Sequence, residues 1–210
     1  MTEVWFIRHG ESEANAGLAT DNPEAIELTS LGKKQANKVS EAFEKKPDLI
    51  VASKYKRAMQ TAQPTLKKFQ NTPFEIWDVR EFTYLSPAKL QSTTQSERRP
   101  LSQSYWKKSD PSYVHGEGAE SFEGFINRVK KAHERITNVS DGFVAIFCHG
   151  FVIKTFLWSN LLGTFKTSSE YMKNFYSFHK AFDFPNCGII KAEYHANKNL
   201  YSGIITSHLN

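Results

Sequence analysis

The chain of 210 residues has little cysteine and lacks any long apolar run. Its two cysteines, Cys148 and Cys187, are too few for a disulfide framework, and Cys148 lies in an apolar run typical of a small buried residue. No apolar stretch approaches the roughly 20 residues that span a bilayer. The first residues have too short an apolar run for a signal peptide. These absences indicate a reduced, cytoplasmic protein with no membrane partner.

The composition is that of an ordinary globular protein, with 40% hydrophobic and 23% charged residues, which excludes disorder. The length predicts one domain over residues 1–210, with room for an insertion. A chain of this size buries roughly 70% of the surface that its unfolded form exposes. It therefore needs neither a metal nor a disulfide to fold.

Positive charge is in excess, with 27 Lys and Arg against 22 Asp and Glu, and the sequence pI is about 9.1. Such a charge suits an anionic partner. The basic pairs are scattered, however, and no zinc-finger, RNP or basic-zipper pattern is present, so nucleic acid is not the expected partner. Most pairs are explained as solvated helix faces. A small phosphorylated substrate would use the same field.

Short apolar segments alternate with amphipathic ones along the chain. Strands are expected at 3–7, 49–52, 74–77, 143–148, 188–194 and 200–206. Helices are expected from 29 or 30 to about 45, then at 55–69, 121–136, 151–162 and 168–178, with Thr29 or Ser30, Ser53 and Ser121 as N-caps. This alternation predicts a three-layer α/β/α fold with a mostly parallel central sheet of about six strands.

Residues 82–118 have weak periodicity and are interpreted as a loop-like insertion that folds over the carboxyl ends of the strands. A long loop in a compact domain is usually functional. Its aromatic side chains either pack a small core of their own or form apolar walls for a substrate; they are Phe82, Tyr84, Tyr105, Trp106 and Tyr113. Arg98 and Arg99 are candidate ligands for a second anionic group on that substrate. His115 is given no catalytic role.

Two predicted strands end at a His-Gly pair, His9-Gly10 and His149-Gly150. Either histidine alone is more often an ordinary hydrogen-bonded residue. Ligands bind beyond the carboxyl ends of strands in open α/β sheets, so the repeated arrangement favours two histidines meeting over one ligand. Glycine after each histidine permits a sharp turn and close backbone approach to an anion.

Three further side chains fit a phosphate pocket. Arg8 adds a permanent cation beside His9, and Arg57 lies in the first turn of a predicted helix, whose N-terminus attracts phosphate. Glu81 follows the third predicted strand. It is either a structural ion-pair partner or, beside a phosphate pocket, a carboxyl with a raised pKa that donates a proton.

At these positions the sequence resembles the histidine phosphatase superfamily, in its phosphoglycerate-mutase-like branch. The resemblance rests on ordered blocks, namely Arg8–Asn15, Leu28-Thr29 with Gly32 and Gln35-Ala36, Ser53 with Arg57–Ala62, Glu81, Gly118–Ser121, Cys148–Gly150 and Asn186–Gly188. A lone Arg-His-Gly is a weak signal, whereas these blocks in the family's order are a specific one.

The resemblance implies a mechanism. His9 would attack phosphorus and form a phosphohistidine, while Arg8, Arg57 and His149 would hold the phosphoryl oxygens. Asn15 and Gly150 would also contact the phosphate. Glu81 would protonate the leaving oxygen and then activate water. Neither a metal nor another cofactor is implied.

The expected activity is hydrolysis of a small phosphomonoester. Phosphoglycerate-mutase-type transfer and a non-catalytic phospho-ligand binding module remain alternatives. The family's mutases are usually longer and carry an Arg-Arg-Ser-Tyr type stretch, whereas Arg98-Arg99 is followed here by Pro100-Leu101. The residues after Glu81 also depart from the pattern common in phosphatases of this branch. The sequence does not distinguish a monomer from a homodimer.

Overall fold

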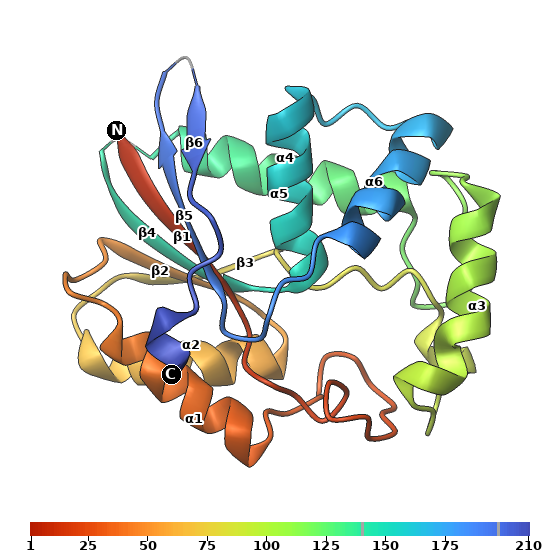
Figure 1. The fold of residues 1–210 in the computed structure, drawn as a ribbon, viewed down its shortest axis with the longest axis horizontal. Coiled ribbons are helices and arrows are strands. Elements are labelled where there is room, and N and C mark those ends of the chain that lie inside the picture. The colour runs from red at the N-terminus through yellow and green to blue at the C-terminus, as the bar shows by residue number, and fades with distance from the viewer. Residues whose placement is uncertain (140, 197) are drawn as a thin grey trace.

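The computed structural model describes residues 1–139, 141–196 and 198–210 and is built on a six-stranded sheet with the order β3-β2-β4-β1-β5-β6 (Figure 1). The parallel part of the sheet consists of β3 (Phe74–Trp77), β2 (Leu49–Ser53), β4 (Gly142–Cys148) and β1 (Thr2–Arg8). The antiparallel edge consists of β5 (Ile189–Tyr194) and β6 (Asn199–Tyr201). The mostly parallel α/β fold expected from the sequence is confirmed.

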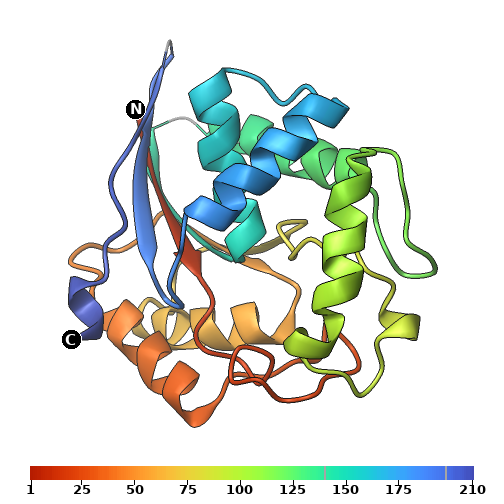
Figure 2. The same cartoon turned by 45° about the vertical axis from the view of Figure 1, so that its right-hand side comes forward.

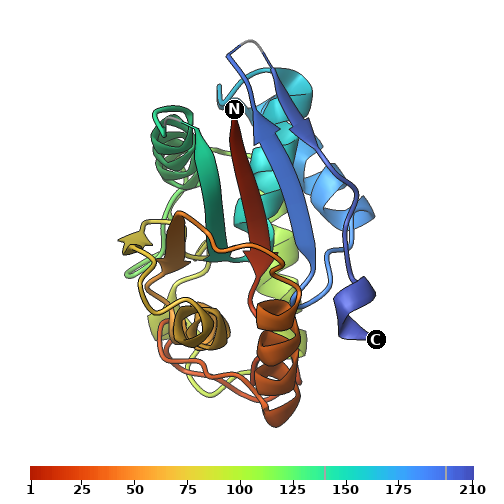
Figure 3. The ribbon, with the colours of Figure 1, turned by 90° about the vertical axis from the view of Figure 1, so that its left-hand side faces the viewer.

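Helices cover both faces of the sheet, as Figures 2 and 3 show. One face carries α1 (Ser30–Glu41) and α2 (Lys56–Lys68), which contribute to a core cluster with Trp5 and Ile7 of β1. The other carries α4 (Phe122–Thr137), α5 (Gly150–Leu162) and α6 (Ser169–Ala181), around Val4 and Phe6. Because alternate residues of a strand point to opposite faces, the continuous apolar run of β1 supplies both clusters.

The register of β1 and β4 brings distant segments of the chain together. Arg8 pairs with Cys148 at the last position of the two strands, and the backbone N–H of His9 donates to the carbonyl of Cys148 over 3.0 Å. The residues that follow the two strands, His9 and His149, therefore lie side by side at the same edge of the sheet.

The prediction that residues 82–118 form a loop-like insertion is wrong in one respect. This segment contains the helix α3 (Gln95–Lys108) after a 3-10 turn at Pro87–Lys89. Thr94 and Glu97 form a capping box at its start. Its buried residues are Tyr105 and Trp106 alone, so most of the helix is exposed to some degree and its sequence has no clear apolar period. In Figure 2, α3 stands beside the carboxyl ends of the central strands.

The aromatic residues of the insertion do not form a small core of their own. Tyr105 and Trp106 are instead buried in the core cluster of the domain, beside α4 and α6. Phe82 and Tyr84 belong to or pack against the same cluster and also line the cavity described below.

The end of the chain departs from the sixth predicted strand. Regular pairing of β6 stops at Tyr201, and Ile205 makes an isolated antiparallel bridge to Ile189. A 3-10 turn follows at Ser207–Leu209 and lies against α1. Across the described ranges, no helix combines the length and the apolar character needed to cross a membrane.

Candidate active site

A cavity of about 810 Å³ opens at the carboxyl ends of β1 and β4. Its lining combines side chains that are far apart in the sequence. Of the residues singled out in the sequence, it includes Arg8, His9, Asn15, Arg57, Glu81, Arg98, Arg99 and Gly150. His149 is not part of the lining.

His9 is held in one protonation state. Its side chain is buried, with Nδ1 2.7 Å from the carbonyl oxygen of Gly10 and Nε2 3.2 Å from Nε of Arg57. Because a guanidinium can only donate, Nε2 must accept, and Nδ1–H then donates to Gly10. Burial and the charges of Arg57 and Arg8 lower the pKa of His9 well below its usual value. The result is a neutral imidazole whose Nε2 is unprotonated, which is the protonation state that a nucleophile requires.

The loop that carries His9 packs so closely that it requires glycine. A Cβ atom on Gly10 would lie 2.6 Å from the carbonyl oxygen of Gly32, and one on Gly32 would lie 2.0 Å from that of Glu11. The N–H of Gly10 donates to Thr61 Oγ1 over 3.0 Å. These contacts fix the turn after β1 against the start of α1.

Arg57 in the first turn of α2 is buried and bridges two segments. Besides His9, it donates from Nη1 to the carbonyl of Pro23 over 2.7 Å. Its Nη2 makes no hydrogen bond to any part of the chain that the structure describes. Burial lowers the pKa of Arg57 to about 10, so the group stays cationic at neutral pH.

Arg8 is the second cation at the cavity. Its Nη1 donates to the carbonyl of Phe184, whereas Nε is buried and has no hydrogen-bond partner within the described residues. Buried N–H groups in native proteins nearly always have an acceptor. The unpartnered N–H of Arg8 therefore marks a place where an anionic ligand fits. Gly150 keeps this place open, since a Cβ there would lie 3.7 Å from Nε of Arg8.

His149 lies beside His9, with ring centroids 5.1 Å apart, and is fully buried. Its Nε2 is 2.8 Å from Ser53 Oγ, and its Nδ1 has no partner among the residues described. The expected position of Ser53 as the N-cap of α2 is wrong, because Tyr55 occupies that position and makes no side-chain cap, but the hydroxyl of Ser53 still accepts from the backbone N–H of Tyr55 over 3.3 Å. The same hydroxyl, at the end of β2, also holds the ring of His149.

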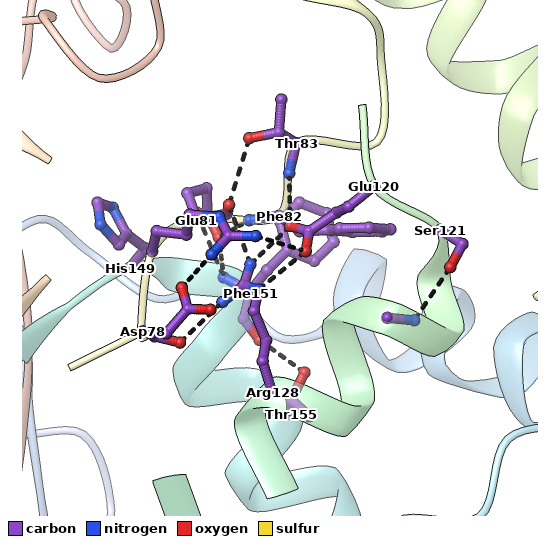
Figure 4. A network of polar contacts seen from close by, with 12 residues as sticks. Asp78, Glu81, Phe82, Thr83, Glu120, Ser121, Arg128, His149, Phe151 and Thr155 are labelled. Atoms are coloured by element: carbon purple, nitrogen blue, oxygen red, sulfur yellow. Dashed lines mark hydrogen bonds and ion pairs between the residues drawn. The ribbon is translucent and has the colours of Figure 1, made fainter. Parts of the chain in front are cut away.

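Glu81 lies on the segment after β3 and is bound by backbone N–H groups (Figure 4). Its Oε1 accepts from Phe82 over 3.0 Å and from Phe151, in the first turn of α5, over 3.2 Å. Burial raises the pKa of Glu81, although the hydrogen bond from Phe82 and the charges of Arg57 and Arg8 oppose the shift. A partly buried carboxyl with a raised pKa beside a cationic cavity is suited to donate a proton.

The sequence analysis did not predict the ion pair that supports the segment carrying Glu81. Arg128 of α4 donates to both carboxylate oxygens of Glu120, over 2.9 and 2.6 Å, and to the carbonyl of Glu81 over 3.2 Å. Glu120 in turn accepts from the backbone N–H of Thr83 over 3.2 Å. Glu120 falls in one of the family-like blocks, but nothing in the amphipathic pattern of α4 marks Arg128.

Hydrogen bonds from neighbouring residues orient the side-chain amide of Asn15. Its Oδ1 accepts from Ser12 Oγ and from Nδ2 of Asn186, each over 3.0 Å. Asn186 also donates to the backbone carbonyl of His9 over 3.0 Å. With Oδ1 occupied, the amide group of Asn15 that remains for a ligand in the cavity is a donor.

Arg98 and Arg99 both line the cavity but differ in their contacts. The guanidinium of Arg98 donates to the carbonyls of Thr20 and Thr93, each over 2.6 Å, and to that of Leu90 over 3.2 Å. It ties the loop after β1 to the insertion. Arg99 is exposed, and its side chain makes no hydrogen bond or ion pair with any residue that the structure describes. No cluster of three or more His, Cys, Asp or Glu that could hold a metal occurs within the described parts of the chain.

Residues 4–202 match the model of the histidine phosphatase superfamily, branch 1. A metal-independent phosphoserine phosphatase of Arabidopsis thaliana is 29% identical over 158 residues, a match that covers 73% of this chain and 66% of the relative. A phosphoglycerate mutase-like protein of the same organism is 25% identical over 159 residues, covering 73% and 68%. The match thus spans about two thirds of the length of these curated relatives.

Solved structures agree on the fold. A mutant phosphoserine phosphatase from Entamoeba histolytica, in complex with phosphoserine, superposes with a TM-score of 0.74 at 20% identity over all of both chains. An alpha-ribazole phosphatase from Shigella flexneri also gives 0.74, at 21% identity over 98% of this chain and 96% of that chain. With the family model matching nearly the whole sequence, this chain belongs to the histidine phosphatase superfamily.

Proposed function

We propose that this protein is a metal-independent phosphatase that hydrolyses small phosphomonoesters through a phosphohistidine intermediate. The observation that carries the proposal is the neutral His9, whose unprotonated Nε2 faces Arg57 at a cavity that also holds Arg8 and Glu81. Family membership and a phosphatase relative support the same conclusion.

In the first step, Nε2 of His9 forms a bond to phosphorus as the bond to the leaving oxygen breaks. Glu81 gives its proton to that oxygen. Arg8, Arg57 and the amide of Asn15 hold the phosphoryl oxygens, and the two guanidinium groups stabilise their charge. Throughout, Nδ1–H of His9 remains hydrogen-bonded to Gly10.

In the second step, the carboxylate of Glu81 takes a proton from water as the water oxygen attacks phosphorus. The P–N bond breaks, its electron pair returns to Nε2 of His9, and phosphate leaves. His149 lies beside His9, and its Nδ1, which has no partner among the described residues, is the atom that would contact the phosphoryl group once that group is attached to His9. Ser53 keeps the ring of His149 in place.

Hydrolysis is favoured over transfer to a second hydroxyl because nothing in the described C-terminal segment covers the cavity. Residues 207–209 form a turn against α1, where Lys38 Nζ donates to the carbonyl of Leu209 over 2.8 Å. None of the described residues after Phe184 lines the cavity. Water therefore has access to a phosphohistidine, and exclusion of water is what transfer would require.

A phosphatase screen over phosphorylated metabolites tests the proposal, with O-phosphoserine included because a relative bears that activity in its name. The His9→Ala protein is the blank. We expect release of inorganic phosphate by the unaltered protein alone, and an acid-labile phosphoprotein in quenched reactions. Binding of phosphorylated ligands without turnover would instead favour a binding module, and interconversion of phosphoglycerates without phosphate release would favour a mutase.

A further inference from the structure

One tyrosine at the cavity has no part in the two proposed steps, although it contacts residues that have. Tyr55 lines the cavity and is 3% exposed. Its backbone is held on both sides, because its N–H donates to Ser53 Oγ over 3.3 Å and its carbonyl accepts from Ala58 over 2.9 Å. The preferred N-cap residues are Asn, Asp, Ser, Thr and Gly. Since Tyr55 makes no side-chain cap, helix capping does not account for a tyrosine at the start of α2.

The guanidinium of Arg57 lies over the ring of Tyr55, with Cζ 4.9 Å from the ring centroid. A cation within about 6 Å of an aromatic face is attracted to it, and more strongly where water is excluded. The other contacts of this buried guanidinium are to Nε2 of His9 and to the carbonyl of Pro23. Because an aromatic face binds a cation without a directional hydrogen bond, it holds the guanidinium near His9 while Nε–H turns toward a phosphoryl oxygen.

The same ring also packs against His149. The two ring centroids are 5.3 Å apart and the planes are at 70°, which is an edge-to-face arrangement. On its other contact, the imidazole of His149 is bonded to Ser53. Tyr55 therefore touches two of the groups that are proposed to hold the phosphoryl oxygens, Arg57 and His149.

The hydroxyl of Tyr55 reaches the segment that carries Glu81. Its Oη lies 3.0 Å from Oγ1 of Thr83, and that Oγ1 lies 3.4 Å from the carbonyl oxygen of Glu81. The carboxyl of Glu81 depends on the position of this segment, because its Oε1 accepts from the backbone N–H of Phe82. A shift of the segment would therefore move the proposed proton donor.

We propose that Tyr55 is a positioning residue for the reaction, whose ring holds Arg57 beside His9 and whose hydroxyl holds the segment that carries Glu81. The inference rests on the proposed phosphatase activity and adds to it a residue that neither takes nor gives a proton. An ordinary core tyrosine would affect stability alone. The ring and the hydroxyl can be removed separately, so their two effects can be measured one at a time.

The variant Tyr55→Phe tests the hydroxyl, because it keeps the ring and loses the bond to Thr83. We expect kcat/KM for the best alkyl phosphate of the screen to fall by about 3- to 10-fold, as for the loss of one hydrogen bond. Para-nitrophenyl phosphate, which depends less on protonation by Glu81, should be affected less. Thr83→Val removes the other partner and should give the same selective loss, with no further loss in the double variant. Additive losses, or equal losses for the two substrates, would contradict the role of the hydroxyl.

The variant Tyr55→Leu tests the ring and should lower kcat/KM for both substrates by about 10- to 30-fold. Among the described residues, the charged and titratable groups that face His9 are Arg8 of β1, Arg57 of α2 and His149 after β4. The charge of Arg57 lowers the pKa of His9, so that pKa rises if Arg57 leaves its place. Tyr55→Leu should therefore lose activity at acidic pH, whereas Tyr55→Phe should keep the acid side of the profile. An unchanged acid side in Tyr55→Leu would overturn the role of the ring.

Tyr171 provides a matched control, since it is buried, bonded to Ser159 Oγ over 3.0 Å and outside the cavity lining. Tyr171→Phe and Tyr171→Leu should change the free energy of unfolding but neither the pH profile nor the ratio between the two substrates. Tyr55→Met repeats the test of the ring if Tyr55→Leu does not fold. Absence of phosphatase activity in the unaltered protein would refute the proposed function itself. Activity with the same profile and ratio in all Tyr55 variants refutes only this inference.

Discussion

The Nε–H of Arg57 lies 3.2 Å from Nε2 of His9 and donates to the atom that would attack phosphorus. This single contact fixes the tautomer of the imidazole and, through its charge, helps to keep the ring neutral. The same N–H covers the electron pair of the nucleophile. On substrate binding it must therefore turn from the imidazole to a phosphoryl oxygen, which couples substrate binding to activation of His9.

Replacing Arg57 by Gln is expected to lower kcat/KM by about 10²- to 10³-fold, as is typical for loss of a donor to a developing charge. It should also change the pH profile. The charge of Arg57 lowers the pKa of His9, so its removal lets that pKa rise and the ring becomes protonated at acidic pH. A new loss of activity on the acid side, absent in the exposed-site control Arg135→Gln, is the expected signature. A profile of unchanged shape would contradict this account.

Glu81 is expected to control the alkaline side of the profile. Its raised pKa means that the protonated fraction falls as the pH rises through that value, so protonation of the leaving group slows. Glu81→Gln should reduce kcat/KM for an alkyl phosphate by about 10²- to 10⁴-fold. The rate of the first step should fall much less for para-nitrophenyl phosphate, because its leaving group needs less protonation. Equal losses for the two substrates would argue against a role as proton donor.

Arg128 is expected to contribute to the stability of the fold more than to the reaction itself. It is 8% exposed and forms a bidentate pair with Glu120, so Arg128→Met leaves a largely buried carboxylate with only its longer ion pair to Arg80, over 3.3 Å. Removing the one partner of a buried pair typically costs about 3–5 kcal/mol in the free energy of unfolding. Because Arg80 still offsets part of the charge, the expected loss is at the lower end of that range or below it. The double variant Arg128→Met with Glu120→Gln should recover much of it, because the uncompensated charge is gone. Denaturant unfolding measures the free energy of unfolding of the single and the double variant. If the double variant is no more stable than Arg128→Met, the uncompensated carboxylate of Glu120 is not the cause of the loss.

Arg98 is expected to organise the cavity wall rather than bind substrate directly. Its guanidinium is occupied by the carbonyls of Thr20, Leu90 and Thr93, so Arg98→Ala frees two segments. Backbone hydrogen exchange should increase around residues 18–23 and 90–94, and KM should rise for all substrates alike. Arg99→Ala, at the exposed neighbour, should leave hydrogen exchange unchanged. A loss confined to doubly anionic substrates would support the direct binding role expected from the sequence.

The elements that the sequence predicted correctly are those whose residues carry a strong local pattern. The apolar runs of β1 and β4 are buried on both faces, and Thr29 caps α1 as expected. The helix α3 was missed because a helix with only Tyr105 and Trp106 buried has no apolar stripe to detect. Ser53 was predicted as the N-cap of α2 but lies two residues before it, where its hydroxyl accepts from the N–H of Tyr55 and also holds His149. A serine before a helix has the same sequence signature at either position.

By itself the sequence determined the mostly parallel sheet, a histidine at the end of each of two strands and the membership of a phosphatase family, since strand pattern and motif order are local properties of the chain. Only the tertiary structure decided which nitrogen of His9 is unprotonated, that Arg98 is engaged by backbone carbonyls, and that Tyr55 contacts both Arg57 and Thr83. Hydrogen bonding and desolvation depend on neighbours that are distant in sequence, and these fix the protonation state and availability of each group.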